Sequence, residues 1–133
     1  MSQMGRRHFT IDEVQNALSR GKAVECLIGR CERQGVGGIR YGYLRYGAER
    51  FGSGRFELRI FESVDHGIFW DEAAPLNPEL DLGDADETHS FDTLADALGY
   101  MEDRWNGISQ RLVNEFMLPH EYDDLFREHM SRG

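Results

Sequence analysis

The sequence contains few cysteines and prolines, almost no lysine and no long run of apolar residues. Among its 133 residues are 2 cysteines, 3 prolines and one lysine, Lys22. No apolar stretch is long enough to span a bilayer, and no apolar segment follows Arg6 and Arg7 as a secretory signal peptide requires. We therefore expect a cytoplasmic protein that does not contact a membrane.

The two cysteines do not suggest redox or zinc chemistry. Cys26 and Cys31 lie too far apart for a C-x-x-C motif, and they fall in a predicted strand and at its end. Because no secretory signal is present, we expect two reduced structural thiols rather than a disulfide.

The sequence also lacks the signatures of known catalytic centres. It contains no G-x-S-x-G elbow, no H-E-x-x-H zinc motif and no phosphate-binding loop. Residues 81–87 offer several carboxylates, but Gly83 precedes Asp84, whereas an EF-hand loop places its glycine after the third acid. We therefore predict no catalytic residue, no metal site and no cofactor, and an enzyme is the less favoured class.

Length and composition predict a single domain over residues 1–133, with a flexible N-terminus over residues 1–8. The hydrophobic fraction, 40%, is ordinary for a globular protein and argues against a disordered chain. Thr10 and Glu13 have the spacing of a capping box, so the first helix is expected to begin there and to end before Gly21.

Extended segments follow this helix. Alternating apolar and polar residues predict strands over residues 23–33, 39–46 and 55–64, with a short fourth strand over residues 68–70. Glycine-rich turns separate the first three segments. Such closely spaced strands form an antiparallel meander, because parallel neighbours need long crossover connections.

The C-terminal half combines an acidic segment with helices. Residues 71–90 contain two prolines and are interpreted as a long acidic loop. Ser90 is expected to cap an amphipathic helix over residues 91–105, followed by a short helix near residues 112–117 and a last helical segment over residues 120–130. The predicted fold class is α+β, an antiparallel meander sheet of three to four strands packed on one face by an N-terminal helix and C-terminal helices.

Charge is distributed unevenly between the two halves of the chain. Residues 1–60 contain 11 arginines and lysines against 6 acids, whereas residues 61–133 contain 4 against 18. The two halves therefore carry formal charges of about +5 and −14. The overall formal charge is −9. A protein of this charge attracts basic surfaces and repels nucleic acid, although charge does not specify a fold.

The segment Tyr41–Tyr46 partly matches the strand signature of RNA-recognition motifs. Tyr41 and Tyr43 share a sheet face on which bases could stack. Ile39 and Arg40 do not fit the first two positions, however, and no helix is expected between the first two strands. Together with the net charge, these departures predict that the protein has no nucleic-acid partner.

The leading hypothesis is an acidic module that binds a basic protein. Its most concrete form is an immunity or inhibitor protein that neutralises a basic toxin or effector, because dense carboxylates accelerate association with such partners. Two neighbouring aromatic residues could anchor the interface. The predicted partner-binding residues are Asp71, Glu72, Glu79, Asp81, Asp84, Asp86, Glu87, Phe69 and Trp70.

Two alternatives remain open on sequence grounds. His66 and His89 flank the acidic segment and could form a general acid–base pair in a small enzyme or ligand-binding protein. An acidic secretion chaperone, usually dimeric, would also fit the size and charge. The apolar stripe over residues 112–126 suits either internal packing or the seam of a homodimer.

Overall fold

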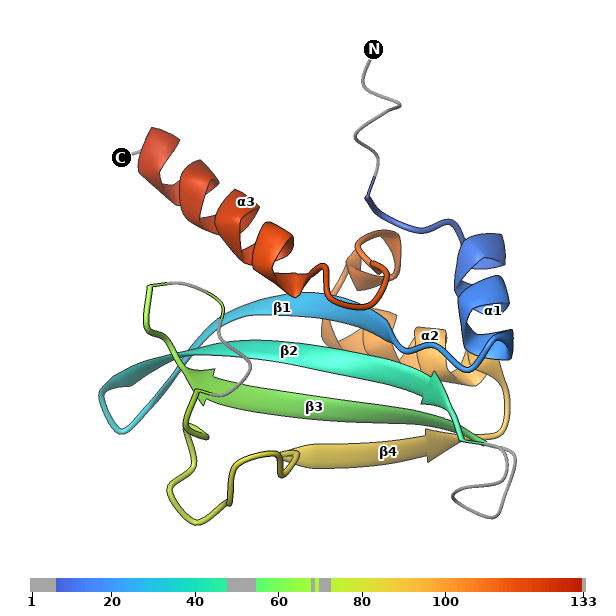
Figure 1. Ribbon diagram of the computed structural model, residues 1–133, viewed down its shortest axis with the longest axis horizontal. Helices are drawn as coiled ribbons and strands as arrows, with labels where there is room; N and C mark the ends of the chain where they lie inside the picture. Colours follow the sequence, from blue (N-terminus) through green and yellow to red (C-terminus); the bar gives the residue numbers. More distant parts are fainter. Residues whose placement is uncertain (1–6, 48–54, 68, 70–72, 133) are drawn as a thin grey trace.

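The computed structural model describes residues 7–47, 55–67, 69 and 73–132, with side chains up to Leu125. Four antiparallel strands form one sheet in the order β1-β2-β3-β4, which confirms the predicted α+β meander (Figure 1). The elements are α1 (Ile11–Ser19), β1 (Val24–Arg33), β2 (Val36–Tyr46), β3 (Phe56–Val64), β4 (Glu87–Phe91), α2 (Leu94–Arg104), the 3-10 helix η2 (Ile108–Gln110) and α3 (Leu118–Arg132).

The first helix begins as its sequence predicts. The Glu13 backbone N–H donates to Thr10 Oγ1 at 3.2 Å, and the Thr10 N–H donates to Glu13 Oε1 at 2.8 Å. This reciprocal pair satisfies two backbone donors that a helix start would otherwise leave unpaired. The helix then buries Val14, Ala17 and Leu18 against the sheet.

Helices cover both faces of the sheet. On one face, Leu44, Leu58 and Ile60 pack with residues of α1 and α2. On the other face, Leu27 and Tyr41 pack with Leu118 and Tyr122 of α3. Figure 1 shows α2 behind the sheet and α3 above its β1 edge. The sequence predicts helices on one face only, and the structure adds α3 on the opposite face because both sides of β1 and β2 are apolar.

The fourth strand differs from the predicted one. Phe69 is not in a strand, and Ile68 and Trp70 lie outside the described residues. Instead, residues 87–91, assigned to the acidic loop and the helix start, pair with β3, with Phe56 opposite Phe91. Four consecutive polar residues precede Phe91, so this edge strand has no alternating hydrophobic pattern to reveal it.

The helix after β4 also begins later than predicted. Thr93, not Ser90, is its N-cap, since Thr93 Oγ1 accepts from the Asp96 N–H at 3.0 Å. The buried face of the helix follows Leu94, Ala97 and Met101, and Ala95 is exposed.

The predicted short helix near residues 112–117 is wrong. Val113 forms a two-way backbone bridge with Glu25, at 2.8 Å in each direction, and so extends the pairing of β1. The last helix begins at Leu118, two residues before the prediction, with Pro119 in its first turn, where its missing N–H has no cost.

Most of the apolar stripe over residues 112–126 packs inside the chain. Leu112, Val113, Leu118 and Tyr122 are almost fully buried. In addition, buried Glu121 of α3 accepts from Arg7 Nε at 2.7 Å and contacts His8. The contacts with the N-terminal segment hold α3 across the sheet.

Candidate functional site

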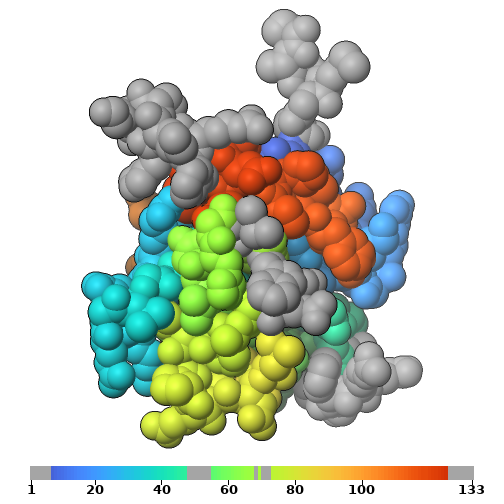
Figure 2. All heavy atoms as spheres, turned by 60° about the vertical axis from the view of Figure 1, so that its left-hand side comes forward, coloured from blue at the N-terminus to red at the C-terminus, as the bar shows by residue number. Residues whose placement is uncertain are grey.

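A groove of about 480 Å³ opens between the sheet and the start of α3. Its size falls within the range of pockets that hold small molecules or partner side chains. Figure 2 views the molecule with α3 at the top and the yellow-green segment around residues 73–86 at the bottom. The groove is lined by Ala23, Glu25, Tyr43, Arg45, Glu57, Arg59, Phe61, Phe69, Glu115, Phe116, Leu118 and Pro119.

Glu25 is a buried carboxylate in the wall of this groove. The residue is only 5% exposed, and its Oε1 has no hydrogen-bond partner among the described residues. Burial raises the pKa of Glu25, and the neighbouring Glu115 carboxylate raises it further. The backbone N–H groups of Phe116, Leu118 and Met117 lower the pKa but do not offset the burial.

Phe116 lies at the edge of the groove with an exposed ring and a left-handed backbone conformation. Its side chain is 82% exposed, and its backbone has a φ of 68°. The left-handed region costs a residue with a Cβ about 1–2 kcal/mol. Gln34, the other described non-glycine residue with positive φ, lies in the tight β1–β2 turn, where this conformation is expected.

Charged side chains of both signs line the groove. The register places Glu25 of β1, Tyr43 of β2 and Arg59 of β3 in one row across the sheet, which separates Glu25 from Arg59 by about 10 Å. Arg59 Nε lies 3.7 Å from Glu57 Oε1. Arg45 lies opposite Glu57 in the register. Two arginines thus share Glu57 on the β2 and β3 side of the groove, and two acids, Glu25 and Glu115, lie on the β1 side.

Aromatic rings form the floor beside these charges. Tyr41 stacks on Phe61 with centroids 5.5 Å apart, and it meets Tyr43 and Phe69 edge-on at 5.8 and 5.0 Å. Tyr41 is 4% exposed, and its hydroxyl is 2.8 Å from Ser63 Oγ. Tyr41 is therefore part of the core, whereas Tyr43 and Phe61 are partly exposed in the groove.

The sequence-predicted acids divide into several environments. Asp71 and Glu72, like Trp70, lie outside the described residues, and Phe69 lines the groove. Glu79 is exposed. Asp81 and Asp84 are exposed in one turn, where the Asp81 N–H donates to Asp84 Oδ2 at 3.0 Å.

This acidic turn lies on the groove side of the sheet. A second cavity of about 200 Å³ is bounded by Leu82 and Asp84 and shares Tyr43 and Phe61 with the groove. Leu82 is 59% exposed. The exposed Leu82 and the Asp84 carboxylate therefore adjoin the aromatic floor.

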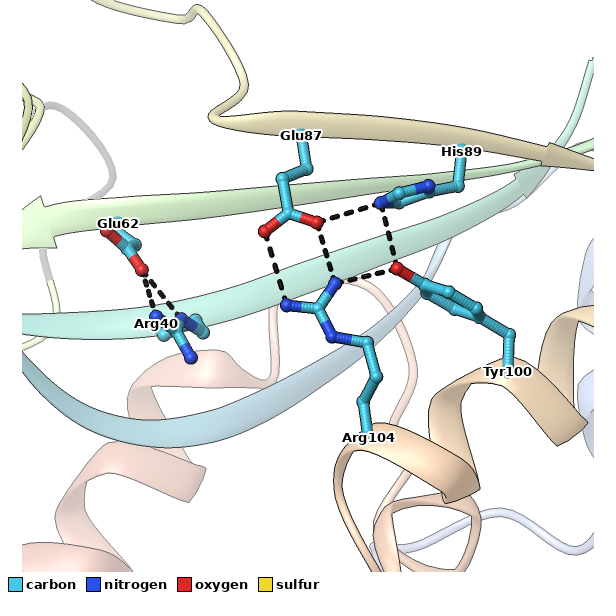
Figure 3. Close-up of polar contacts among 6 residues, drawn as sticks. All are labelled: Arg40, Glu62, Glu87, His89, Tyr100 and Arg104. Carbon is cyan, nitrogen blue, oxygen red and sulfur yellow. Dashed lines mark hydrogen bonds and ion pairs between the residues drawn. The ribbon is translucent and has the colours of Figure 1, made fainter.

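Asp86 and Glu87 are occupied by contacts within the protein. Asp86 Oδ2 accepts from the Glu62 N–H at 2.7 Å. Glu87 accepts from Arg104 Nη1 at 2.6 Å and lies 2.8 Å from His89 Nε2 (Figure 3). The hydrogen bonds from Arg104 and His89 lower the pKa of Glu87 to about 2. These two acids fasten β4 to β3 and to α2.

The two histidines that flank the acidic segment are not brought together. His89 lies opposite Leu58 in β3 and contacts the Tyr100 hydroxyl at 3.1 Å (Figure 3). His66 follows the far end of β3 at Val64, and the strand from Leu58 to Val64 spans about 20 Å. The same view shows Arg40 paired with Glu62, so the polar cluster on this face consists of closed pairs.

The described residues contain no group of three His, Cys, Asp or Glu side chains placed to bind one metal ion. Within the same ranges, no helix combines the length and apolarity needed to cross a membrane. No protein-family model matches the chain, and comparisons with curated proteins and solved structures give no significant similarity. We therefore infer function from the geometry of this chain alone.

Glu25, Glu115 and Phe116 are not among the site residues predicted from the sequence. A charged residue inside the apolar run Val24–Ile28 was an available signal, because glutamate is rarely fully buried without a partner. Nothing local predicts the conformation of Phe116, since the long-range bridge between Glu25 and Val113 places the segment before α3.

Proposed function

We propose that this protein is an acidic binding module that engages a basic protein through the α3 side of its sheet. The observation that supports this best is Phe116, 82% exposed with a φ of 68° at the edge of a groove of about 480 Å³. Strained, exposed aromatic residues persist where the surrounding structure holds them and where function benefits.

Phe116 has the properties of an interface anchor. Full burial of a phenylalanine side chain against a partner contributes about 1.5–3 kcal/mol. Its conformation is fixed before binding, because the following residues enter α3 and the preceding ones bridge to β1. A rigid aromatic residue loses little conformational entropy on binding, which favours affinity.

Charge supports a basic partner. The chain has a formal charge of −9, and Asp81 and Asp84 lie exposed on the groove side. Such carboxylates steer a basic partner toward the aromatic floor and suppress acidic competitors. An inhibitor or immunity protein that covers a basic toxin or effector is the most concrete form of this function.

The test is affinity capture from a lysate of the source cells by wild-type protein, Phe116→Ala and the control Val36→Ala. Val36 is 47% exposed in the β1–β2 hairpin, away from the groove lining. We expect one basic protein to be captured by wild type and Val36→Ala, and at least tenfold less by Phe116→Ala. Equal capture by all three, or capture of acidic proteins only, would contradict the proposal.

A further inference from the structure

We propose that the Glu25 end of the groove receives an arginine side chain of the partner, with the guanidinium paired to the Glu25 carboxylate. The inference rests on the proposed function, because the arginine is supplied by the basic partner. It deepens that function by naming the chemical group that the groove selects.

One carboxylate oxygen of Glu25 has no hydrogen-bond partner among the described residues of the free protein. A buried carboxylate is normally paired with a cation or fully hydrogen-bonded. Here Oε1 has no partner among the described residues, and the residue is 5% exposed. Glu115 also lines the groove, and its carboxylate, which has the same sign, raises the pKa of Glu25. A cationic ligand would satisfy the open acceptor and relieve the repulsion.

The cations within the groove do not supply this missing charge. Arg59 lies on β3, two strands away from Glu25, and its Nε is 3.7 Å from Glu57 Oε1. Arg45 of β2 lies opposite Glu57 in the register. Among the described residues, no arginine is paired with Glu25 or Glu115, although both acids line the groove. This distribution favours a basic side chain at Glu25 and disfavours an anion there.

The groove walls favour guanidinium over ammonium. Tyr43 and Phe116 line the groove together with Glu25. A planar guanidinium can pair with a carboxylate through a fork of N–H donors while its face stacks on an aromatic ring. Lysine offers a point charge with a stronger hydration shell, which is less suited to a site that is largely removed from water.

The first experiment uses the unmodified protein and three small probes. We would titrate ¹⁵N-labelled protein with N-acetyl-arginine amide, N-acetyl-citrulline amide and N-acetyl-glutamate amide. Citrulline has nearly the shape of arginine without its charge. We expect the arginine probe to shift the amide signals of Glu25 and residues 116–118, and the citrulline probe to bind at least tenfold more weakly. Equal binding of these two probes, or tighter binding of the glutamate probe, would overturn the inference.

Two matched variants assign the effect to the buried carboxylate. Glu25→Gln and Asp103→Asn each remove one negative charge, but Asp103 is exposed on α2, which covers the other face of the sheet. We expect Glu25→Gln to abolish the preference for arginine over citrulline and Asp103→Asn to keep it. An unchanged preference in folded Glu25→Gln would overturn the inference. If that variant does not fold, the wild-type probe comparison decides.

Failure of this inference can be distinguished from failure of the proposed function. Capture of a basic protein that depends on Phe116 but is unchanged in Glu25→Gln would retain the binding module and overturn the arginine site. Selective arginine-probe binding at Glu25, without Phe116-dependent capture of any protein, would retain the site and contradict the protein-binding function.

Discussion

At the scale of single residues, Phe116 combines an exposed ring with a strained backbone. Its ring gains almost nothing from folding because it remains in water, and its backbone occupies a region that disfavours any side chain with a Cβ. A glycine at this position would remove the backbone cost. Phenylalanine at this position therefore lowers the stability of the fold and provides an exposed aromatic ring, a combination that is common at functional sites.

We expect Phe116→Gly to stabilise the free protein by about 1 kcal/mol, because glycine adopts positive φ without steric cost. Phe116→Ala keeps a Cβ and removes only the ring, so we expect little change in its free energy of unfolding. Urea denaturation of the three proteins measures the difference. If Phe116→Gly were less stable than Phe116→Ala, the strain assigned to this position would be incorrect.

At the scale of elements, β2 passes closely under the segment that follows β3. A Cβ added to Gly38 would lie 2.7 Å from Leu76 Cδ2 and 2.9 Å from the Ser63 backbone oxygen. The carbonyl belongs to a paired strand and cannot move without breaking the ladder, where Gly38 lies opposite Val64. The close approach helps to hold the 73–76 segment against the sheet.

We expect Gly38→Ala to destabilise the protein by about 1–3 kcal/mol through overpacking. Gly37→Ala is a matched control, because the neighbouring position has no heavy atom within 4 Å of an added Cβ. Thermal unfolding of both variants measures the contrast, with a lower midpoint in Gly38→Ala only. Similar midpoints for both would show that the segment yields easily at this contact.

The sequence predicts elements whose signals are local and misses those that depend on distant pairing. The capping box of Thr10 and Glu13 and the alternation of β3 are local, and the structure confirms both. The edge strand β4 is short and polar at its first four residues, so only its pairing with β3 identifies it. The helix predicted over residues 112–117 fails because Val113 pairs with β1, a contact between segments far apart in sequence.

The candidate site shows the same limit. Asp81 and Asp84 are recognisable as exposed acids from the sequence, and Phe69 as an aromatic residue beside them. Their relation to Glu25, Tyr43 and Phe116 depends on the sheet register and on the place of α3. Composition therefore suggests the charge of the partner, and only the fold shows where the partner would bind.

At the scale of the whole molecule, the two faces of the sheet have different chemical roles. On the α2 side, charged side chains pair with each other, such as Glu87 with Arg104 and Arg40 with Glu62. The α3 side has an open groove, a buried Glu25 oxygen with no partner among the described residues, and exposed acids in the 81–84 turn. Net negative charge that is not used internally is thus available where the groove opens.

We expect this charge to control the rate of association with the captured partner. Asp81→Asn with Asp84→Asn should lower the association rate severalfold at low salt, because long-range attraction steers a basic partner to this side. Screening shortens the reach of these charges to about 8–10 Å near physiological ionic strength, so the difference should narrow as salt is added. The dissociation rate should change little, since the turn borders the groove.

A control with the same net charge separates local steering from overall charge. Asp12→Asn with Asp103→Asn changes two exposed acids of α1 and α2, which cover the other face. Stopped-flow association at several salt concentrations should then give a steep salt slope for this control and a flatter slope for the 81/84 variant. Identical slopes would mean that total charge, and not the acidic turn beside the groove, guides the partner.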